Sequence, residues 1–194
     1  MKHFVDISDF NTKKLDSIIR IAKQIKKNSN KFSKICNGKT LGMIFQKEST
    51  RTRVSFNVGF TKLGGHCIEL KADSIGFGKR ETYEDIIKTL SQYINILVIR
   101  NDDHKIIRSL SSLNILPIIN GLSDFSHPCQ ILSDMLTINE NIGNIKNKKI
   151  SWIGDYNNVL RSLIELQNLY KFKLNVIMPK EIIKKNKNKI VKKN

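Results

Sequence analysis

Apolar residues recur along the chain at two different spacings, and the two alternate from one end to the other. Spacings of three and four residues, which place side chains on one face of a helix, predict helices at 12–27, 51–63, 81–93, 103–112 and 159–170, and another that opens at 127–130. Short aliphatic and β-branched runs predict strands at 40–45, 66–70, 94–99, 115–119, 150–153 and 173–177. Strands that alternate with helices form parallel sheets through right-handed crossovers. We therefore expect an α/β fold in which helices flank a parallel sheet.

A polar stretch at 139–149, with Gly143 and several Lys and Asn residues, is the best candidate for a domain boundary. It separates a first predicted domain at 1–139 from a second at 149–194, which is shorter than the roughly 50–250 residues of a usual domain. The segment 71–80 contains two glycines and few apolar residues, so we expect a mobile loop there.

The chain of 194 residues carries 34 Lys and Arg against 17 Asp and Glu, a net charge of +17. Such a surplus can indicate a polyanionic partner. However, the lysines are mixed with Asn and Ile throughout, including the Lys-rich segment after Pro179. No element concentrates Arg and aromatic residues as nucleic-acid-binding domains do. We expect no nucleic-acid partner and keep a basic nucleic-acid-binding protein only as a distant alternative.

Cys36, Cys67 and Cys129 are odd in number and show no C-x-x-C spacing. They indicate reduced thiols in a cytoplasmic protein, and neither a disulfide framework nor a zinc site. Asp6 and Asp9 near the start, without a long apolar run, argue against a targeting segment. No stretch approaches the about 18 consecutive apolar residues that predict a membrane span. We expect a cytoplasmic protein without membrane association.

The stretch from Ser49 to Arg53 lies between the strand predicted at 40–45 and the helix predicted at 51–63. It places three hydroxyls and two arginines at a helix N-terminus, where unpaired N–H groups and a partial positive charge favour anions. Arginine adds a planar donor fork that matches phosphate. The alternative interpretation is an ordinary N-cap followed by surface arginines. No Gly-x-x-x-x-Gly-Lys precedes the helix, so the stretch is not a P-loop.

Other polar residues also follow predicted strands. Arg100 ends one strand, His127 and Gln130 follow another, and Asn157 and Asn158 follow a third. Because ligands of parallel α/β sheets bind at the carboxyl ends of the strands, this convergence favours a ligand site over a set of unrelated turn and surface residues.

Three ordered motifs resemble those of a known family. They are Phe45-Gln46-Lys47-Glu48-Ser49-Thr50-Arg51-Thr52-Arg53-Val54-Ser55-Phe56, continued by Leu63-Gly64-Gly65-His66; His127-Pro128-Cys129-Gln130; and Gly154-Asp155-Tyr156-Asn157-Asn158-Val159. The first resembles the carbamoyl-phosphate signature of the transcarbamylases, and the third resembles their ornithine-side loop. The second resembles the form typical of ornithine carbamoyltransferases, since aspartate enzymes usually have Thr where Cys129 stands. The resemblance covers essentially the whole chain.

The resemblance implies transfer of the carbamoyl group from carbamoyl phosphate to the δ-amine of ornithine, giving citrulline and phosphate in arginine biosynthesis or a urea-cycle-type step. The implied carbamoyl-phosphate site consists of Ser49, Thr50, Arg51, Thr52, Arg100, His127 and Gln130. The first four would hold the phosphate, Arg100 and His127 would polarise the carbonyl oxygen, and Gln130 would orient the amide. Asn157 and Asn158 would contact ornithine. The family further implies a homotrimer with sites between subunits, and no metal, cofactor or covalent intermediate.

The sequence departs from the family pattern at several points. The family's mobile loop usually carries a Gln that reaches the neighbouring subunit's carbamoyl phosphate, and Gly76 stands at that position. The usual Asp-Thr-Ala of the next helix reads Asp85-Ile86-Ile87. The later ornithine motifs and the C-terminal helix that packs on the first domain are missing. We therefore expect a truncated chain whose second α/β domain is incomplete.

Two alternatives stay open because the later specificity motifs are missing. The chain could be a transcarbamylase for another amine, or an inactive anion-binding fragment that associates with a partner chain. We expect the isolated chain to bind carbamoyl phosphate weakly and to make little or no citrulline, because catalysis requires both substrates in one geometry.

Overall fold

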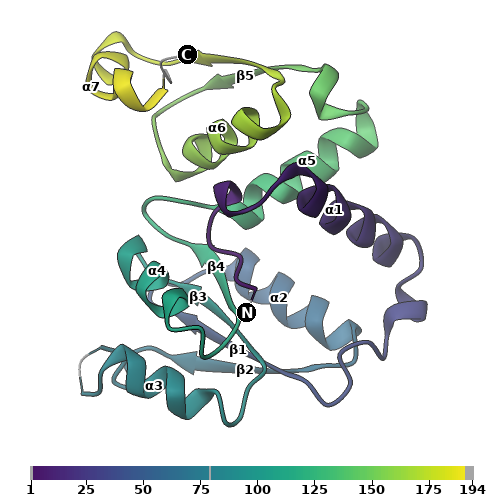
Figure 1. Ribbon diagram of the computed structural model, residues 1–194, viewed down its shortest axis with the longest axis vertical. Coiled ribbons are helices and arrows are strands. Elements are labelled where there is room, and N and C mark those ends of the chain that lie inside the picture. The colour runs from purple at the N-terminus through teal and green to yellow at the C-terminus, as the bar shows by residue number, and fades with distance from the viewer. Residues whose placement is uncertain (1, 79, 191–194) are drawn as a thin grey trace.

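The computed structural model describes residues 2–78 and 80–190, which form two parallel sheets, the smaller one near the top of Figure 1. The larger sheet has four strands in the order β2-β1-β3-β4, each parallel to its neighbours. Its strands are β1 (Thr40–Phe45), β2 (His66–Lys71), β3 (Ile96–Arg100) and β4 (Ile118–Leu122). The expected α/β fold with a parallel sheet is confirmed.

Helices cover both faces of the larger sheet. α3 (Tyr83–Leu90) and α4 (His104–Ser112) lie on one face, and α2 (Thr50–Lys62) lies on the other. Successive side chains of a strand point to opposite faces, so Ile99 of β3 packs with the side of α3 and α4 while Val98 packs with the side of α2. Both side chains are fully buried. The central strands are therefore continuous apolar runs in the sequence, which is typical of strands that are covered on both faces.

A smaller unit follows α5 (Pro128–Asn141), which leads up from the larger sheet in Figure 1. In this unit β5 (Lys149–Ile153) pairs in parallel with β6 (Lys173–Ile177), and α6 (Asn158–Tyr170) makes the crossover between them. The predicted strands and helix of this region are all present. The Lys-rich segment after them, for which the sequence predicted no element, contains α7 (Lys180–Ile190).

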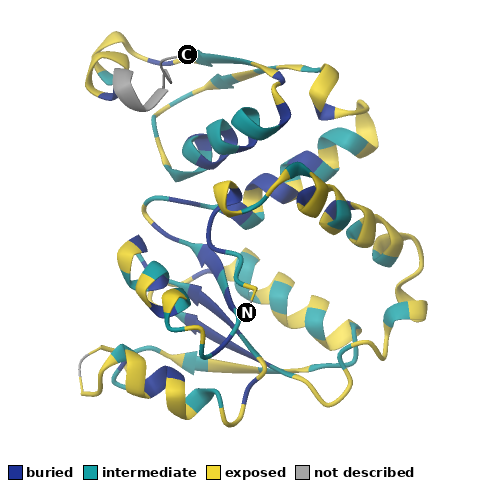
Figure 2. Cartoon of the chain, in the orientation of Figure 1, coloured by how far each residue is buried: buried dark blue, intermediate teal, exposed yellow. Residues whose placement is uncertain are grey.

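One hydrophobic cluster joins the two units. Its buried members are Ile7, Leu15, Ile19, Ile131, Leu132, Met135, Ile145, Leu163, Leu166, Tyr170 and Phe172. They come from the N-terminal segment with α1 (Thr12–Lys27), from α5, and from α6 with the residues around it. Figure 2 shows buried positions on all three helices where they approach one another. The polar stretch 139–149 thus separates the two sheets along the chain, while the core beneath them is continuous.

Polar contacts reinforce this shared core. The hydroxyl of Tyr170 donates a hydrogen bond to Asp16 Oδ1 on α1 at 2.7 Å. Lys26, near the end of α1, pairs with Glu140 of α5 at 2.7 Å between Nζ and Oε2. Because the ammonium group is mostly exposed, this ion pair contributes little to stability. The apolar contacts therefore account for most of the attachment of α1.

The fourth strand lies three residues later than the sequence predicted. The apolar run at 115–119 indicated the strand, but β4 spans Ile118–Leu122, and Asn120 and Gly121, predicted to begin a loop, belong to it. The N-terminal segment explains the shift. Phe4 N donates to Ile118 O and Asn120 N donates to Phe4 O, both at 2.8 Å, so an unexpected neighbour stabilises the later register.

Two smaller boundary predictions were also wrong. The strand predicted at 94–99 begins only at Ile96, and the helix predicted at 81–93 ends at Leu90, after which the chain turns back to the sheet. In the loop predicted at 71–80, residues 72–78 are mainly turns, and Phe77 is 3% exposed and packs against the Tyr83 ring at 4.8 Å between centroids. Residue 79 of that predicted loop, and residues 191–194 of the second predicted domain, lie outside the described residues.

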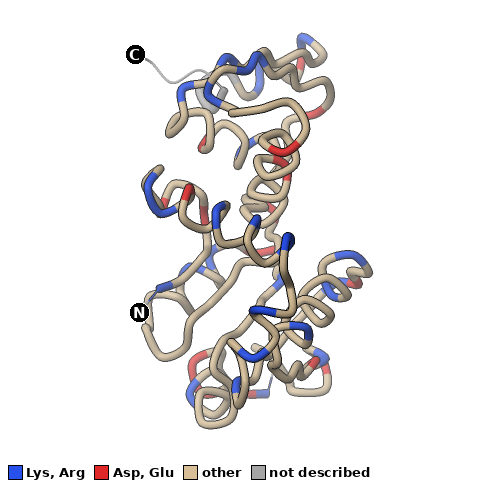
Figure 3. Tube along the Cα trace, turned by 90° about the vertical axis from the view of Figure 1, so that its right-hand side faces the viewer, with Lys and Arg blue, Asp and Glu red and all other residues tan. Residues whose placement is uncertain are grey.

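Basic residues are spread along the whole trace in Figure 3, with acidic residues interspersed among them. This distribution matches the mixed pattern of the sequence. Among the described residues, none of the helices is long and apolar enough to cross a membrane.

Candidate functional site

A hollow of about 670 Å³ lies at the carboxyl ends of β1, β3 and β4. Its walls come from the first turns of α2 and α5, the end of β3, and the start of α6. The sequence-predicted residues that line it are Ser49, Thr50, Arg51, Thr52, Arg100, His127 and Gln130. The fold therefore gathers in one place all seven residues proposed for the carbamoyl-phosphate site, from segments up to about 80 positions apart along the chain.

The N-terminus of α2 presents polar groups to this hollow. Ser49 is the N-cap residue, with extended backbone angles (φ −151°, ψ 102°), and it is 8% exposed. Its side chain makes no capping hydrogen bond within the described part of the chain, although a serine at this position commonly caps a helix. Ser49 and the first turn of α2 line the same hollow, and the unpaired N–H groups of such a turn fit an anion.

The two arginines of this turn have different surroundings. Arg51 lines the hollow, and its side chain is exposed to it. Arg53 instead donates a hydrogen bond from Nη1 to Glu69 Oε1 on β2 at 3.0 Å. Arg51 is therefore the arginine of this turn that is placed to contact a ligand, because the planar guanidinium of Arg53 is already paired.

Arg100 and His127 approach the hollow from the sheet and from α5. Arg100 is the last residue of β3, and its backbone oxygen accepts a hydrogen bond from Gln46 N at 3.1 Å. His127 is the N-cap residue of α5, and Pro128 fills the first helical position, where a missing N–H costs nothing. Arg100 Nε and His127 Nδ1 are buried and have no hydrogen-bond partner among the described residues. Buried polar atoms are nearly always paired, so these two favour a ligand site.

The imidazole of His127 is neutral at pH 7. Burial, and to a lesser extent the nearby positive charge of Arg100, together lower its pKa from 6.5 to about 4. A neutral imidazole still carries one N–H donor. His127 can therefore donate a hydrogen bond without adding a second full charge beside Arg100.

Gln130 and Cys129, both in the first turn of α5, differ in their exposure and in their hydrogen-bond partners. Gln130 Nε2 donates to Asp134 Oδ1, one helical turn away, at 2.9 Å, and its side chain stays exposed at the mouth of the hollow. The thiol of Cys129 donates to Asn120 O at 3.4 Å. Burial raises the pKa of Cys129 to about 12, so the thiol stays protonated at neutral pH. Cys129 thus lines the hollow with a protonated thiol and supplies no nucleophile.

The asparagine pair of α6 lies outside the residues that line the hollow. Asn157 caps the helix, since its Oδ1 accepts hydrogen bonds from the backbone N–H groups of Val159 and Leu160 at 3.0 and 3.1 Å. Asn158 Nδ2 donates to Ser123 O at 2.6 Å. From this unit Val159 lines the hollow. The structure therefore does not bring the asparagines together with the other predicted residues, and their contact with an amine substrate stays a prediction.

A buried polar cluster beside the site was missed by the sequence analysis. Asp6 is 2% exposed and accepts hydrogen bonds from His104 Nε2 at 3.1 Å and from Arg108 Nη2. Burial raises the pKa of Asp6, but hydrogen bonds from His104 and Ser126 and the charge of Arg108 outweigh it, so the pKa lies below 3.8. The one available signal was an acidic residue inside the apolar run Phe4-Val5-Asp6-Ile7.

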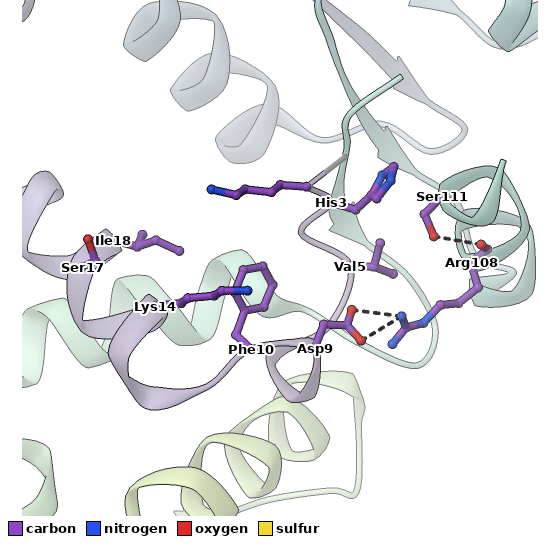
Figure 4. A pocket seen from close by; sticks show the side chains of 10 residues that line it. His3, Val5, Asp9, Phe10, Lys14, Ser17, Ile18, Arg108 and Ser111 are labelled. Atoms are coloured by element: carbon purple, nitrogen blue, oxygen red, sulfur yellow. Dashed lines mark hydrogen bonds and ion pairs between the residues drawn. The ribbon is translucent and has the colours of Figure 1, made fainter. Parts of the chain in front are cut away.

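A second hollow, of about 460 Å³, lies between the N-terminal segment, α1 and α4. Figure 4 shows Arg108 facing Asp9, to which it donates hydrogen bonds of 2.9 Å, and His3 and Lys14 also line this hollow. None of the sequence-predicted site residues lines it. Within the residues 2–78 and 80–190, no group of three or more His, Cys, Asp or Glu side chains is arranged to hold a metal ion.

The fold and the site together define an α/β protein with a candidate ligand site at the strand ends of its larger parallel sheet. The family model described as "Aspartate/ornithine carbamoyltransferase, carbamoyl-P binding domain" matches residues 2–140, and that described as "Aspartate/ornithine carbamoyltransferase, Asp/Orn binding domain" matches residues 146–194. The chain belongs to the aspartate/ornithine carbamoyltransferase family.

Ornithine carbamoyltransferases are among the proteins that the chain is similar to. The chain is 44% identical to that of Ruthia magnifica subsp. Calyptogena magnifica and 42% identical to that of Brucella ovis, in each case over 93% of this chain. The match covers 61% and 58% of those relatives, so the chain spans about 60% of their length.

Solved structures of ornithine carbamoyltransferases also resemble this chain. The ornithine carbamoyltransferase of Burkholderia thailandensis E264 superposes with a TM-score of 0.87 at 34% identity, covering 94% of this chain and 63% of that one. The enzyme of Pyrococcus furiosus superposes with a TM-score of 0.86 at 39% identity, covering 93% and 58%. The order and packing of the elements described above are therefore those of this family.

Proposed function

We propose that this chain takes part in the transfer of the carbamoyl group from carbamoyl phosphate to the δ-amine of ornithine, in arginine biosynthesis in the cytoplasm. In this proposal residues 1–139 bind carbamoyl phosphate, and residues 149–194 belong to the ornithine-binding domain. The observation that carries it is the convergence of Ser49–Thr52, Arg100 and His127 on one hollow. The His-Pro-Cys-Gln form and the names of the similar proteins favour ornithine over aspartate.

The proposed reaction needs only positioning and charge stabilisation. The neutral amine attacks the carbonyl carbon, a C–N bond forms, and the bond between that carbon and the phosphate oxygen breaks. Phosphate leaves with the electron pair and takes up the proton that the amine nitrogen releases. Donors fixed where negative charge develops on the carbonyl oxygen lower the barrier most effectively. In the proposal Arg100 supplies a charged donor and neutral His127 supplies a second, uncharged one.

The phosphate leaving group would lie at the N-terminus of α2. There the hydroxyls of Ser49, Thr50 and Thr52 and the backbone N–H groups would surround it, with Arg51 closing one side. Charge-assisted hydrogen bonds contribute roughly 1.5–3 kcal/mol each. Gln130 would have to turn from Asp134 toward the carbamoyl amide, a rotation that its exposed side chain permits.

Phosphate binding tests this site directly. We expect inorganic phosphate and carbamoyl phosphate to bind in isothermal titration calorimetry, and Arg51→Ala to weaken phosphate about tenfold to a hundredfold. Arg51→Lys should recover little of the loss, because an ammonium group cannot copy the bidentate fork. Arg20→Ala, on the exposed side of α1, is the matched control and should bind as the wild type does.

Equal phosphate affinity in Arg51→Ala and the wild type would exclude the proposed site. A citrulline assay with carbamoyl phosphate and ornithine, run beside other amines, separates the remaining alternatives. Turnover with a different amine would identify another transcarbamylase. Phosphate binding without any turnover would identify an anion-binding chain that depends on a partner.

We further propose that the chain assembles as a homotrimer through α2 and β2. Among the described residues of α2 none is buried, and Val54 and Val58, one helical turn apart, are 50% and 45% exposed. β2 is the outer strand of its sheet, and Ile68 on it is 36% exposed. Apolar side chains at a sheet edge and on an adjacent helix are suited to cover one another between copies.

Analytical ultracentrifugation should therefore show trimers at high protein concentration. Val58→Lys should shift the distribution to smaller species, because it places a charge in the proposed interface. Ile142→Lys changes a residue that is 59% exposed at the end of α5 and should leave the distribution unchanged. A strictly monomeric wild type would contradict the proposed assembly.

A further inference from the structure

The loop that connects β4 to α5, residues 123–127, carries His127 and is held by one face of α6. Asn158, Arg161 and Ser162 supply the contacts, and their spacing of three and four residues places them on the same side of the helix. α6 belongs to the second unit, whereas the loop belongs to the first sheet. The position of the candidate catalytic histidine is thus set partly by a helix from the other unit.

Ser162 makes the contact nearest to the histidine. Its side chain is fully buried, and its Oγ accepts a hydrogen bond from the backbone N–H of His127 at 2.9 Å. The same hydroxyl lies 3.1 Å from the hydroxyl of Ser126. A hydroxyl can accept from one group while it exchanges a hydrogen bond with another. One side chain therefore fixes two successive residues at the start of α5.

The rest of the loop is fixed from both sides. Phe125 lies between the Arg161 guanidinium, 3.1 Å from its ring centroid, and the His104 ring, which stacks on it at 4.8 Å between centroids. His104 Nδ1 also lies 2.8 Å from Ser123 Oγ. The loop is thus clamped between α4 and α6, so a shift of α6 would be transmitted to it.

We propose that Ser162 is a positioning residue for His127, and that its hydroxyl, carried by α6, sets the imidazole in place against the carbamoyl group. This inference rests on the proposed carbamoyl-transfer function. Misplacement of a catalytic group by about 1 Å can cost about a hundredfold in rate. Because α6 begins directly after the loop 154–157 predicted to meet the amine, the contact links the two substrate-binding regions.

The test is an NMR titration of the His127 imidazole in the 194-residue chain. The chain contains four histidines, so the signal of His127 can be assigned as the one that is lost in His127→Gln. The charged and titratable side chains that line the same hollow are Glu48, Arg51, Arg100, Cys129 and Asp134. In the wild type the imidazole should titrate near pH 4 because it is buried beside Arg100. In Ser162→Ala the released loop should admit water, and the midpoint should rise toward 6.5 by at least about one pH unit.

Two variants separate positioning from a general loss of packing. Ser162→Thr keeps the hydroxyl acceptor and should return the midpoint to the wild-type value. Ser111→Ala removes a half-buried helical hydroxyl that donates to Arg108 O at 2.8 Å, and should leave the His127 midpoint unchanged. If Ser162→Ala does not fold, Ser162→Cys replaces it, since a thiol of similar size accepts hydrogen bonds only weakly and should shift the midpoint in the same direction.

An unchanged midpoint in the folded Ser162→Ala or Ser162→Cys variant would overturn the proposal, as would a shift of the same size in Ser111→Ala. A phosphate titration of the wild type distinguishes failure of this proposal from failure of the proposed function. If phosphate fails to bind, the function is refuted while the His127 titration can still be read. If phosphate binds and the midpoint does not move, only the role of Ser162 is refuted.

Discussion

Phe172→Ala should lower the free energy of unfolding by about 3–5 kcal/mol, the range for removal of a buried aromatic side chain. Phe172 follows α6, is 1% exposed, and packs in the cluster shared by α1, α5 and α6. Urea unfolding followed by circular dichroism measures the change. The control is Tyr93→Ala, which removes an aromatic ring that is 74% exposed and should change stability by no more than about 0.5 kcal/mol.

The shape of the same unfolding curve tests the shared core. Because one cluster joins the two units, wild type and Phe172→Ala should each unfold in a single transition. Two transitions in the wild type, of which Phe172→Ala moves only one, would show that the units unfold independently. That outcome would contradict a core that continues beneath the polar stretch 139–149.

Asp6→Ala should also cost about 3–5 kcal/mol of stability, the range for breaking a buried ion pair from one side. The carboxylate is 2% exposed, and its removal leaves His104 and Arg108 without the group between them. Thermal or urea unfolding measures the loss. Glu84→Ala breaks a surface pair with Lys88 on α3 and, as the control, should leave the stability nearly unchanged.

The pH dependence of the free energy of unfolding should change in one direction if Asp6 stabilises the fold as proposed. The pKa of Asp6 is lower in the folded protein than the 3.8 of the free side chain, so the unfolded chain takes up a proton first on acidification. The stabilisation is complete above about pH 4 and is lost as the pH falls through the lower folded value. The stability difference between wild type and Asp6→Ala should therefore shrink in acid, and a difference that grows there would contradict the assignment.

The elements of the fold could be read from the sequence because their signals are local. Helical spacing and aliphatic runs depend on neighbouring residues, and β1 and α2 were placed to within a residue at each boundary. β4 was misplaced because its register depends on Phe4, more than a hundred residues away. A boundary that a distant segment decides has no local signal.

Some residues of the candidate site could likewise be predicted from the sequence, and others could not. Ser49, Arg100 and His127 were brought together by a topological rule, because strand ends of one parallel sheet meet at one edge. Asp6, His104 and Ser162 follow no such rule, since their contacts depend on side-chain packing between segments far apart in the chain. For Asn157 and Asn158 the residue type was ambiguous, because an asparagine after a strand serves equally as a helix cap or as a ligand donor.

The attachment of α1 imposes an order on folding during synthesis. Its apolar side chains share one cluster with those of α6, and the hydroxyl of Tyr170 reaches Asp16, 154 residues earlier in the chain. At about 5–20 residues per second, a ribosome needs roughly 8–30 s to make that stretch. Throughout this interval the stripe of Leu15 and Ile19 lacks its partners from α6. Part of the apolar face of α1 therefore stays uncovered until α6 has been made, although α1 precedes α6 by more than a hundred residues in the chain.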